Sequence, residues 1–529
     1  MTPVAGRERP QFWTLTASDT SAGAGMQADL AVANRLDVQC GCMVIAITSQ
    51  NSLGVCHSQM LDLALIQQQW QALAADGWPG VIRLGWLPAD PELLDWLLLV
   101  LASCPARVVW DPVLGATHAQ ANSGELGEGQ GGREGLQSLR RLLPAIDVLT
   151  PNCAEAAWLA GLDSASAEAD IANALLEAGV GAVLITGGDD GPDDQRVYDR
   201  FYQRCPVACD NPEERMMPAF VVSHPRWPLR AHGTGCHLAA GLAASLARGD
   251  RLYDAVLMAI RVASASVQNA SLRSSGYHNC FASLDDGTWP ELDWQIHTPQ
   301  SFYEAQDIGF MPPAPMLPKL DRPLGLYGLV DNLEWLKALL ALGIDTLQWR
   351  VKEPQGDFRA HTAEAIRLCQ EAGVPLYIND YWQLALELGA WGVHLGQEDL
   401  ATADLQALAE AGMALGVSTH TEWEVLRARS VRPSYIAFGP VFPPLSKQLK
   451  YPPLGTERVQ RWVAANPDYP HTTIGGVCAD NIAEVMATGI GSAAIVTELR
   501  HDGRLAERLA RLREYLPAAG AGPEADRAY

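Results

Sequence analysis

The sequence predicts an α/β protein of two domains, a three-layer α/β/α domain followed by a (β/α)8 TIM barrel. Short apolar runs alternate with helical runs in both parts, which is the pattern of βαβ units. In the C-terminal part the alternation repeats eight times within residues 324–516, which is the size and rhythm of one barrel. The 529 residues also exceed what one ordinary hydrophobic core serves.

In the N-terminal half, brief apolar runs predict strands over Met43–Thr48, Val81–Leu84, Val108–Trp110, Val148–Leu149 and Val183–Thr186. Helical stretches fall between them, over Leu136–Leu143, Ala154–Leu159 and Ala167–Ala178. This order predicts a parallel sheet covered by helices.

In the C-terminal half, the expected strands are Gly325–Val330, Thr346–Arg350, Leu376–Ile378, Gly392–His394, Ala414–Gly416, Tyr435–Phe438, Thr472–Ile474 and Ala493–Val496. Polar residues and a glycine cluster just after them: Asp331, Arg350, Lys352, Asp380, Gln397, Ser418, Lys447 and Gly475. Because this end of such a barrel carries the chemistry, these residues predict an active site there.

Proline-rich and glycine-rich segments mark the expected boundaries. We expect a first domain over 1–285, a proline-rich linker over 286–323, the barrel over 324–516 and a flexible tail over 517–529. A glycine-rich segment at 118–135 predicts a flexible loop near the first site.

Composition excludes several classes of partner. The formal net charge of −23 argues against nucleic acid or an anionic membrane, since both require a basic face. The most apolar run, Leu93 to Leu101, contains Asp95 and is too short to span a bilayer. The 11 scattered cysteines, in which the close pair Cys40 and Cys42 lacks companions for zinc, predict a reduced compartment. We therefore expect a soluble cytoplasmic protein that acts on small molecules.

One glycine motif, His232-Gly-Thr-Gly-Cys236, opens a helix of small residues. Backbone N–H groups at such a turn converge on an anion, and the helix dipole adds partial positive charge. A thiol there would have a lowered pKa and could accept a proton from a substrate alcohol. The alternative is a glycine-capped helix start with a buried cysteine, since short glycine motifs recur by chance.

With four other motifs, this segment resembles the hydroxymethylpyrimidine/phosphomethylpyrimidine kinases of the ribokinase-like superfamily. The motifs follow in order within residues 12–280: Ala22-Gly-Ala-Gly-Met-Gln-Ala-Asp29, Thr48-Ser-Gln50, Asp111-Pro-Val113, Thr150-Pro-Asn-Cys-Ala-Glu155 and His232-Gly-Thr-Gly-Cys236. The resemblance implies a ribokinase-like fold, ATP as co-substrate and a dependence on Mg²⁺.

The resemblance also implies roles for individual residues. Asp29 and Gln50 would hold the aminopyrimidine, and Cys236 would be the catalytic base. The phosphate and ATP site would comprise Gly233, Thr234, Gly235, Asn152, Glu155 and Asp111, with the Asn152–Glu155 motif near magnesium. Asp111 has an alternative as a structural carboxylate at a strand end.

The first domain departs from the family pattern at two cations. The family has Lys-Gly-Gly-His where this chain has Thr186-Gly-Gly-Asp189, and a second lysine after Asp-Pro-Val is also absent. Losing cations from a phosphate site weakens charge stabilisation in the transition state. Arg133 and Arg226 are the candidates to replace them.

In the barrel, Gln348, Arg350 and Lys352 alternate along one strand and are expected to face one way. Two cations there suggest a polyanion. Asp380 and Asp399 follow two other strands, and carboxylates at separate strand ends can share Mg²⁺. Taken singly, each acidic pair has an equally plausible role as a helix N-cap.

Together these segments resemble thiamine-phosphate synthase over roughly residues 324–515. The matching motifs are Gln348–Lys352, Ile378–Asp380 and the segments 392–399, 416–421, 439–447 and 474–476. Ser446 stands where a threonine commonly precedes the lysine.

This second resemblance implies a dissociative reaction, in which pyrophosphate leaves and the thiazole nitrogen captures the pyrimidine cation. Mg²⁺ would be held by Asp380 and Asp399. The departing pyrophosphate would be stabilised by Arg350, Lys352 and Lys447. Ser418 would act with them as a catalytic residue. Substrate-binding positions would be Gln348, Asn379, Gly475, Gly476, Val496 and Thr497, the last four for the thiazole phosphate.

Both halves together predict a bifunctional enzyme of thiamine biosynthesis. Hydroxymethylpyrimidine would be phosphorylated twice and then coupled with thiazole phosphate. The alternatives are an active synthase carrying a degenerate, pyrimidine-binding or regulatory kinase-like domain, and a kinase of another small alcohol such as a sugar. A homodimer is expected by analogy with ribokinase-like domains.

Overall fold

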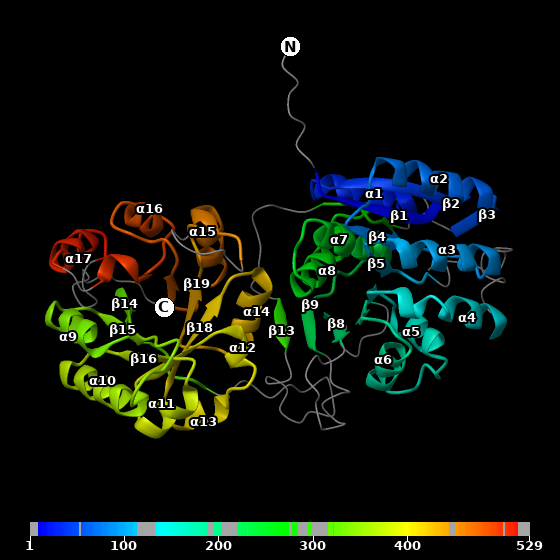
Figure 1. The fold of residues 1–529 in the computed structure, drawn as a ribbon. Coiled ribbons are helices and arrows are strands. Elements are labelled where there is room, and N and C mark those ends of the chain that lie inside the picture. Colours follow the sequence, from blue (N-terminus) through cyan, green and yellow to red (C-terminus); the bar gives the residue numbers. More distant parts are fainter. Residues whose placement is uncertain are drawn as a thin grey trace, which may run out of the picture. The chain divides into compact units, whose positions relative to one another are not determined.

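The computed structural model describes residues 9–51, 54–113, 133–188, 195–203, 219–229, 231–273, 278–283, 294–297, 316–320, 322–443, 451–500 and 503–516. The chain divides into two compact units, residues 1–285 with 297–299 and residues 286–296 with 300–529 (Figure 1). Most of the predicted linker, all of the predicted tail and nearly all of the 118–135 loop lie outside the described residues. The predicted boundaries therefore stay predictions.

The first unit is built on nine strands of one sheet, in the order β9-β8-β7-β6-β5-β4-β1-β2-β3. These strands are β1 (Gln11–Ser18), β2 (Gln39–Asn51), β3 (Gly54–Met60), β4 (Val81–Leu84), β5 (Arg107–Trp110), β6 (Val148–Leu149), β7 (Ala182–Ile185), β8 (Arg196–Gln203) and β9 (Phe220–Pro225). A further strand, β13 (Gln295–His297), spans the point at which the chain passes from residues 286–296 to 297–299. All five predicted strands are present. The central strands β2-β1-β4-β5-β6-β7 run parallel, as predicted, and β3, β8 and β9 pair antiparallel on either side of them.

Helices cover both faces of this sheet and make the three predicted layers (Figure 1). One face carries α1 (Gly25–Arg35), α7 (Thr234–Ala247) and α8 (Leu252–Gln268). The other carries α2 (Leu63–Asp76), α3 (Pro91–Ser103), α4 (Arg133–Arg140), α5 (Cys153–Ala160) and α6 (Glu168–Glu177), over a core that includes Trp13, Ile82 and Trp110. A small sheet of β10 (Ala231–His232), β11 (Ser271–Leu272) and β12 (His278–Asn279) lies at the start of α7.

The second unit is a closed barrel of eight parallel strands, as predicted. The strands are β14 (Leu326–Val330), β15 (Thr346–Trp349), β16 (Leu376–Asn379), β17 (Gly392–Leu395), β18 (Ala414–Thr419), β19 (Tyr435–Phe438), β20 (His471–Thr473) and β21 (Ala493–Ile495). The helices around it are α9 (Leu333–Ala341), α10 (Phe358–Ala372), α11 (Trp382–Leu388), α12 (Gln397–Leu400), α13 (Leu405–Glu410), α14 (Glu422–Ser430), α15 (Gly455–Ala465), α16 (Ile482–Met486) and α17 (Leu505–Arg513). β21 pairs with β14 and closes the barrel.

Three tyrosines fill part of the barrel interior, one each from β14, β16 and β19. Tyr327, Tyr377 and Tyr435 are fully buried, with ring centroids 5.1 to 6.1 Å apart. Gly416 makes room for them, because a Cβ at that position would lie 2.1 Å from Cζ of Tyr435. The tyrosine hydroxyls thus lie below the polar residues of the barrel mouth, inside the strands.

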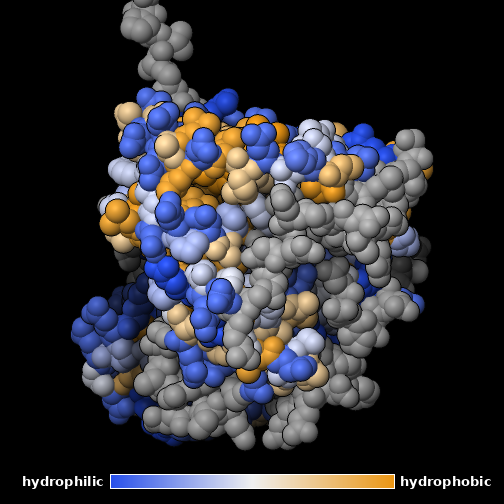
Figure 2. Space-filling model, turned by 90° about the vertical axis from the view of Figure 1, so that its right-hand side faces the viewer, coloured by the Kyte–Doolittle hydropathy of each residue, from blue (hydrophilic) through white to orange (hydrophobic). Residues whose placement is uncertain are grey.

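The surface of the first unit carries exposed apolar side chains, among them Ile47, Leu65 and Leu99. Figure 2 shows apolar residues gathered in the upper part of one face of the molecule. Within the described residues, no helix combines the length and the apolar character needed to cross a membrane. The expected homodimer is not tested by a single chain and stays a prediction.

Candidate active sites

In the first unit, two glycine-rich turns that are distant in sequence meet at the start of α7. Gly233 precedes the helix with φ of 96°, and a Cβ there would lie 1.7 Å from the carbonyl oxygen of Gly23. Gly235 faces Asp111, whose Oδ1 would lie 3.5 Å from a Cβ at Gly235. The hydroxyl of Thr234 donates to the carbonyl of Ala231. The structure therefore brings together the first and last of the five motifs.

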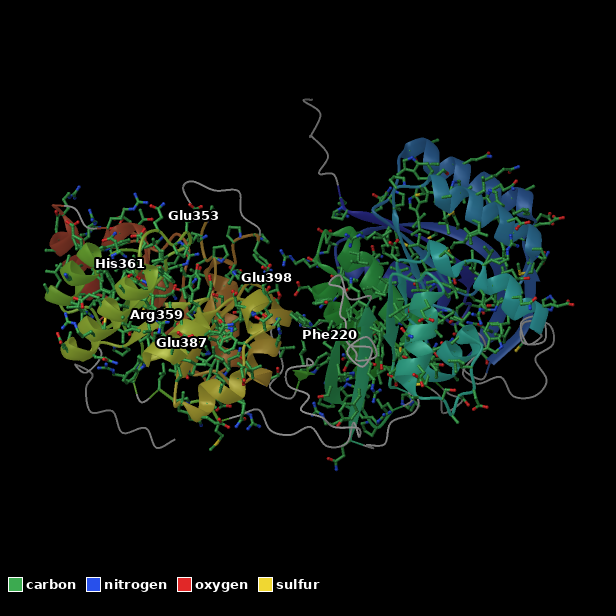
Figure 3. The ribbon with its side chains drawn as sticks, turned by 60° about the horizontal axis from the view of Figure 1, so that its bottom comes forward. Phe220, Glu353, Arg359, His361, Glu387 and Glu398 are labelled. Carbon is green, nitrogen blue, oxygen red and sulfur yellow. The ribbon has the colours of Figure 1, made fainter. Side chains whose placement is uncertain are left out.

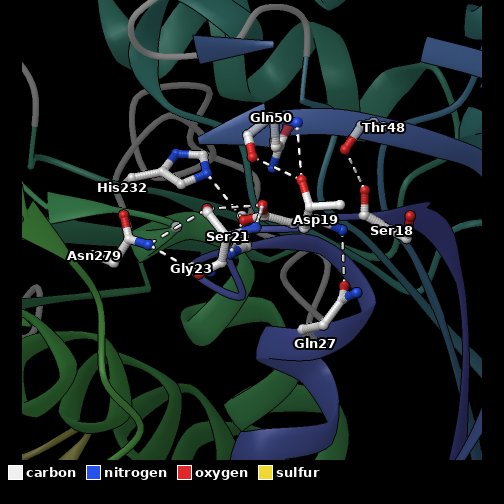
Figure 4. Close-up of polar contacts among 12 residues, drawn as sticks. Ser18, Asp19, Ser21, Gly23, Gln27, Thr48, Gln50, His232 and Asn279 are labelled. Carbon is white, nitrogen blue, oxygen red and sulfur yellow. Dashed lines mark hydrogen bonds and ion pairs between the residues drawn. The ribbon is translucent and has the colours of Figure 1, made fainter. Parts of the chain in front are cut away.

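Asp19 organises the first of these turns (Figure 4). Its Oδ1 accepts from the N–H of Ser21 at 2.7 Å, and its Oδ2 accepts from the N–H groups of Gly23 and Ala24 at 3.0 and 2.7 Å. His232 Nε2 lies 3.3 Å from the same Oδ2. Burial raises the pKa of Asp19, but hydrogen bonds from His232, Gln50 and Ser21 outweigh it and hold that pKa well below its usual range.

Gln50, expected to hold the pyrimidine, lies on this cluster. Its side chain bonds Asp19, and its backbone exchanges two hydrogen bonds with the Thr20 hydroxyl. Asn279 joins from β12, where its Nδ2 donates to the carbonyl of Ser21 at 3.1 Å. Its Oδ1 is buried with no partner among the described residues. Neither Asp19 nor Asn279 was predicted, although Asp19 lies three positions before the motif Ala22–Asp29.

A buried ionic cluster lies beneath the turns, on the face covered by α1 and α7. Arg83 of β4 contacts Asp29 Oδ2 at 3.2 Å and Asp111 Oδ2 at 2.7 Å, and the Thr14 hydroxyl donates to Asp29 at 2.6 Å. Burial raises the pKa of Asp29 to about 6, against the opposing effects of Arg83 and Thr14. Asp29 was expected at the substrate, yet it is completely buried here. Arg83 was missed, although a charged residue inside the apolar run 81–84 was a usable signal.

Cys236 differs from the expectation in its protonation. The thiol is buried against Ala28 of α1 and against Ala24, which precedes that helix. Burial is the largest cause that raises its pKa, and together with Asp111 and Asp29, against the opposing effect of Arg83, it brings that pKa to about 12. The predicted lowering of this pKa is therefore wrong, because loss of hydration and two nearby carboxylates outweigh the helix N-terminus. At neutral pH the thiol is protonated.

Asn152 and Glu155 form a reciprocal capping box at the start of α5. Asn152 Oδ1 accepts from the N–H of Glu155 at 2.8 Å, and Glu155 Oε2 accepts from the N–H of Asn152 at 3.0 Å. The backbone of Asn152 also forms an isolated parallel β-bridge with Thr186, the residue that follows β7. Arg226 reaches the same edge, since its guanidinium donates to the carbonyls of Gly188 and Gly187 at 2.7 and 3.3 Å.

The family's lysine is missing at Thr186 itself. The structure places a cation, Arg226, on the carbonyls of the two glycines that follow Thr186. The side chain of Arg133, the other candidate, lies outside the described residues.

At the barrel mouth, two carboxylates and an arginine come together. Asp380 follows β16 with φ of 67°, and Asp399 lies in α12 after β17. Burial raises the pKa of Asp380 to about 6, and Asp399 raises it as well, while Arg350 and Asn379 act in the opposite direction. Burial lowers the pKa of Arg350, which Asp380 opposes. Among the described residues, no group of three or more His, Cys, Asp or Glu side chains is placed to hold a metal.

A chain of hydrogen bonds connects Ser418 to Gln348 through the barrel interior. Gln348 Nε2 donates to Tyr327 OH at 3.1 Å, and Tyr327 OH lies 2.9 Å from Tyr435 OH. His394 Nδ1 lies 2.7 Å from Tyr435 OH, and its Nε2 lies 2.7 Å from Ser418 Oγ. The structure therefore joins the two residues expected to orient the pyrimidine and pyrophosphate, through three residues to which the sequence assigned no role.

The backbone of Ser418 is also held. Gln397 Nε2 donates to the Ser418 carbonyl at 2.7 Å, and Arg427 donates to the carbonyl of Gln397 at 2.9 Å. Arg427 is almost completely buried. These contacts fix the strand end that presents the Ser418 hydroxyl.

A cavity of about 660 Å³ opens beside the mouth, lined by Asp331, Asn332, Leu333, Trp349, Arg350, Val351, Lys352, Glu353, Gln355, Phe358 and His361. Figure 3 labels Glu353 and His361 among the barrel side chains. Arg350 and Lys352 line it, but Gln348, Asp380, Asp399 and Ser418 do not. β15 ends at Trp349, so the strand alternation expected over Gln348, Arg350 and Lys352 includes Gln348 but neither Arg350 nor the exposed Lys352.

Gly475 and Gly476 follow β20 in a conformation that only glycine adopts easily, with φ of 98° and 70°. A Cβ on either would press within 2.7 Å of Pro440 or Phe442. Val496 and Thr497 follow β21 at the start of a short 3₁₀ helix. The predicted thiazole-phosphate residues therefore lie at adjacent strand ends. Lys447 lies outside the described residues.

Comparison with known families matches both units. Residues 327–499 match the family model described as thiamine monophosphate synthase, and residues 19–280 match that of phosphomethylpyrimidine kinase. A thiamine-phosphate synthase from Photorhabdus laumondii is 46% identical over 190 residues, which are 36% of this chain and 88% of that protein. One from Enterobacter sp. (strain 638) is 44% identical over 211 residues, 40% of this chain and 99% of that protein.

Among solved structures, the pyridoxal kinase from Staphylococcus aureus in complex with pyridoxal is 24% identical. The match covers 55% of this chain and 100% of the pyridoxal kinase chain, with a TM-score of 0.45, which is too low to support a conclusion about function. The two family matches confirm the resemblances predicted from the motifs. The chain belongs to the thiamine-phosphate synthase family through its barrel, carries a phosphomethylpyrimidine kinase domain before it, and is a bifunctional transferase of thiamine biosynthesis.

Proposed function

We propose that the first unit uses ATP to phosphorylate hydroxymethylpyrimidine and then its phosphate, and that the barrel joins the resulting diphosphate to thiazole phosphate. In the barrel, the bond from the pyrimidine methylene carbon to the diphosphate oxygen breaks, and a bond to the thiazole nitrogen forms. The observation that carries the proposal is the meeting of Asp380, Asp399 and Arg350 at the barrel mouth, beside the Ser418 hydroxyl.

The two carboxylates fit a divalent cation. Burial is the largest cause of the raised pKa of Asp380, and repulsion from Asp399 adds to it. A cation bound there would relieve that repulsion. Mg²⁺ binds through one or two carboxylates and completes its shell with water and phosphate oxygens, so two protein ligands suffice. Bound there, it would neutralise charge on the departing diphosphate. Arg350 and Lys352, with Lys447, would donate hydrogen bonds to the same oxygens.

In the first unit, the N–H groups of Gly233, Thr234 and Gly235 would cradle the transferred phosphoryl group at the start of α7. Gln50, Asp19 and Asn279 surround the turn and offer polar groups for the aminopyrimidine. Arg226 would supply the cation that the missing lysine leaves out. Cys236 would serve as base only where bound substrate lowers its pKa, since the buried thiol is protonated.

A paired assay of the full chain tests both halves. One reaction receives hydroxymethylpyrimidine, ATP, Mg²⁺ and thiazole phosphate, and the other receives the ready-made pyrimidine diphosphate with thiazole phosphate. Thiamine phosphate, measured by its oxidised fluorescence, is expected in both. Product from the diphosphate alone would contradict the kinase half, and product in neither would contradict both.

Matched variants assign each half to its site. Asp380→Asn is expected to abolish product in both reactions. Cys236→Ala is expected to remove it only from the reaction that starts with hydroxymethylpyrimidine. Glu387→Gln, an exposed change on α11 of the same barrel, should leave both reactions unchanged.

A further inference from the structure

The chain of hydrogen bonds inside the barrel has a direction. We propose that Tyr327, Tyr435 and His394 are positioning residues that fix the Ser418 hydroxyl as a hydrogen-bond donor toward the barrel mouth. The inference rests on the proposed site at that mouth, and it concerns three residues for which no function was predicted.

The direction follows from the end at Gln348. An amide nitrogen only donates, so Tyr327 OH accepts from Gln348 Nε2 and its own hydrogen points to Tyr435 OH. Tyr435 has then accepted, and its hydrogen goes to His394 Nδ1. The remaining ring nitrogen, Nε2, carries the histidine proton and donates to Ser418 Oγ. Ser418 has accepted once within the chain, so its own hydrogen is directed elsewhere.

The opposite direction fails at the far end. If Ser418 donated to His394 and the ring donated to Tyr435, the hydrogen of Tyr327 would meet only the donating amide of Gln348. A buried hydroxyl hydrogen would then lack an acceptor in the chain, and buried donors without acceptors are rare. With the amide nitrogen of Gln348 facing Tyr327, every hydroxyl hydrogen within the chain of hydrogen bonds has an acceptor only when donation runs from Gln348 toward Ser418.

This direction of donation also requires a neutral imidazole with one proton at His394, and the surroundings of the ring favour that form. His394 is only 7% exposed, and both ring nitrogens face hydroxyl groups.

The consequence concerns the charge that develops in the reaction. Ser418 is half-buried at the strand end, and its hydrogen is left to donate to an anionic oxygen in the mouth. A donor already polarised by a chain of hydrogen bonds binds such an oxygen more strongly. The chain of hydrogen bonds thus orients the Ser418 hydroxyl before the diphosphate departs. This orientation stabilises the transition state more than the ground state.

The tautomer of His394 is the direct test. The full chain, labelled with ¹⁵N-histidine, is examined by NMR, and His394→Gln identifies the resonances of His394. The proton is expected on Nε2. A proton found on Nδ1, or a doubly protonated ring at pH 7, would overturn the proposal.

Activity supplies the second test through a matched pair of tyrosines. Tyr435→Phe breaks the chain, whereas Tyr377→Phe removes a buried hydroxyl outside the chain, on a ring 5.1 Å away. We expect kcat of the synthase reaction to fall about 10- to 100-fold in Tyr435→Phe, the range for outer-shell partners, with little change in KM. Tyr377→Phe should stay near the wild type, and equal effects of the two variants would overturn the proposal.

Two further variants keep the outcomes distinct. Tyr327→Phe interrupts the chain one step earlier and should reproduce the loss of kcat if Tyr435→Phe does not fold. Ser418→Ala leaves the chain from Gln348 to His394 in place. An unchanged rate in Ser418→Ala, with His394 protonated on Nε2, would remove Ser418 from the proposed function while supporting the direction of the chain.

Discussion

The two units place their charged side chains in contrasting environments. In the first unit, Arg83 is fully buried between Asp29 and Asp111, so that charge is paired away from water. At the barrel mouth, Asp380 and Asp399 lie close to each other with like charge, and Asp380 occupies a left-handed backbone conformation. The first cluster lies buried beneath the proposed kinase site, whereas the second cluster lies at the proposed synthase site itself.

The difference predicts opposite responses to removing a charge. A buried pair that loses one partner leaves an uncompensated charge in a medium that solvates it poorly. A pair of like charges that loses one member is relieved of repulsion. The kinase half should therefore depend on its ionic cluster for stability, and the synthase half should carry its carboxylates at a cost in stability.

Arg83→Met gives the largest expected effect. The substitution leaves Asp29 and Asp111 buried without their cation, so we expect the first unit to lose about 3–5 kcal/mol of unfolding free energy. Urea unfolding, monitored by hydrogen exchange in peptides that cover β4 and β5, measures this loss of unfolding free energy.

Arg359→Met is the matched control in the barrel, where Arg359 of α10 forms an exposed ion pair with Glu387 of α11 (Figure 3). Such pairs contribute about 0–1 kcal/mol. Equal losses in the two variants would show that burial of Arg83 does not set its contribution.

The reactivity of Cys236 gives the next effect. With a pKa of about 12, its thiolate fraction at pH 8 is about 10³-fold below that of an ordinary thiol. Alkylation by iodoacetamide, followed by mass spectrometry, should therefore proceed about 10³-fold more slowly at Cys236 than at the exposed Cys56. Comparable rates would mean that Arg83 governs the thiol and that burial does not.

The fold was largely readable from the sequence because parallel strands are apolar on both faces. All eight barrel strands were found where short apolar runs predicted them. The missed strands β1 and β8 contain Thr, Gln, Asp and Arg, which interrupt their apolar runs. Some of these side chains contact other polar groups, as Thr14 does with Asp29 and Asp199 with the N–H of Gly187.

The sites were predicted only as far as neighbours in sequence are neighbours in space. Strand ends gave Asp380, Asp399 and Ser418 correctly as residues of one mouth. The hydrogen bond between Tyr327 and Tyr435 joins residues 108 positions apart, and no local sequence pattern predicts such a contact. The error at Cys236 has the same origin, because its pKa depends on Asp111 and Arg83 from other strands.

Arg226→Ala tests whether the first unit has replaced its missing lysine. A charge-assisted hydrogen bond to phosphate is worth about 1.5–3 kcal/mol, so kcat/KM for ATP should fall about 10- to 100-fold. Arg226→Lys should recover part of the loss, since lysine keeps the charge without the fork. Arg248→Ala, at the exposed end of α7, is the control, and an equal loss there would exclude the role of Arg226.

The smallest effect is expected at Asp380, and its sign is opposite to that at Arg83. The pKa of Asp380 is about 6 in the folded protein and 3.8 as its ordinary value, so the folded state binds the proton more tightly. The contribution of Asp380 to the stability of the metal-free barrel is therefore greatest below about pH 4 and falls as pH rises from about 4 to 6. Asp380→Asn removes this loss, and asparagine tolerates the left-handed conformation.

We expect Asp380→Asn to raise the unfolding free energy of the metal-free barrel at pH 7 by about 1 kcal/mol, since solvent screens an exposed carboxylate. Urea unfolding of the full chain at pH 4 and pH 7, with EDTA present, measures the gain and its pH dependence. Asp331→Asn, which changes an exposed carboxylate at another strand end, should show no such gain. A destabilised Asp380→Asn protein would mean that Asp380 supports the barrel as Arg83 supports the first unit, because the charges of both halves would then serve the fold.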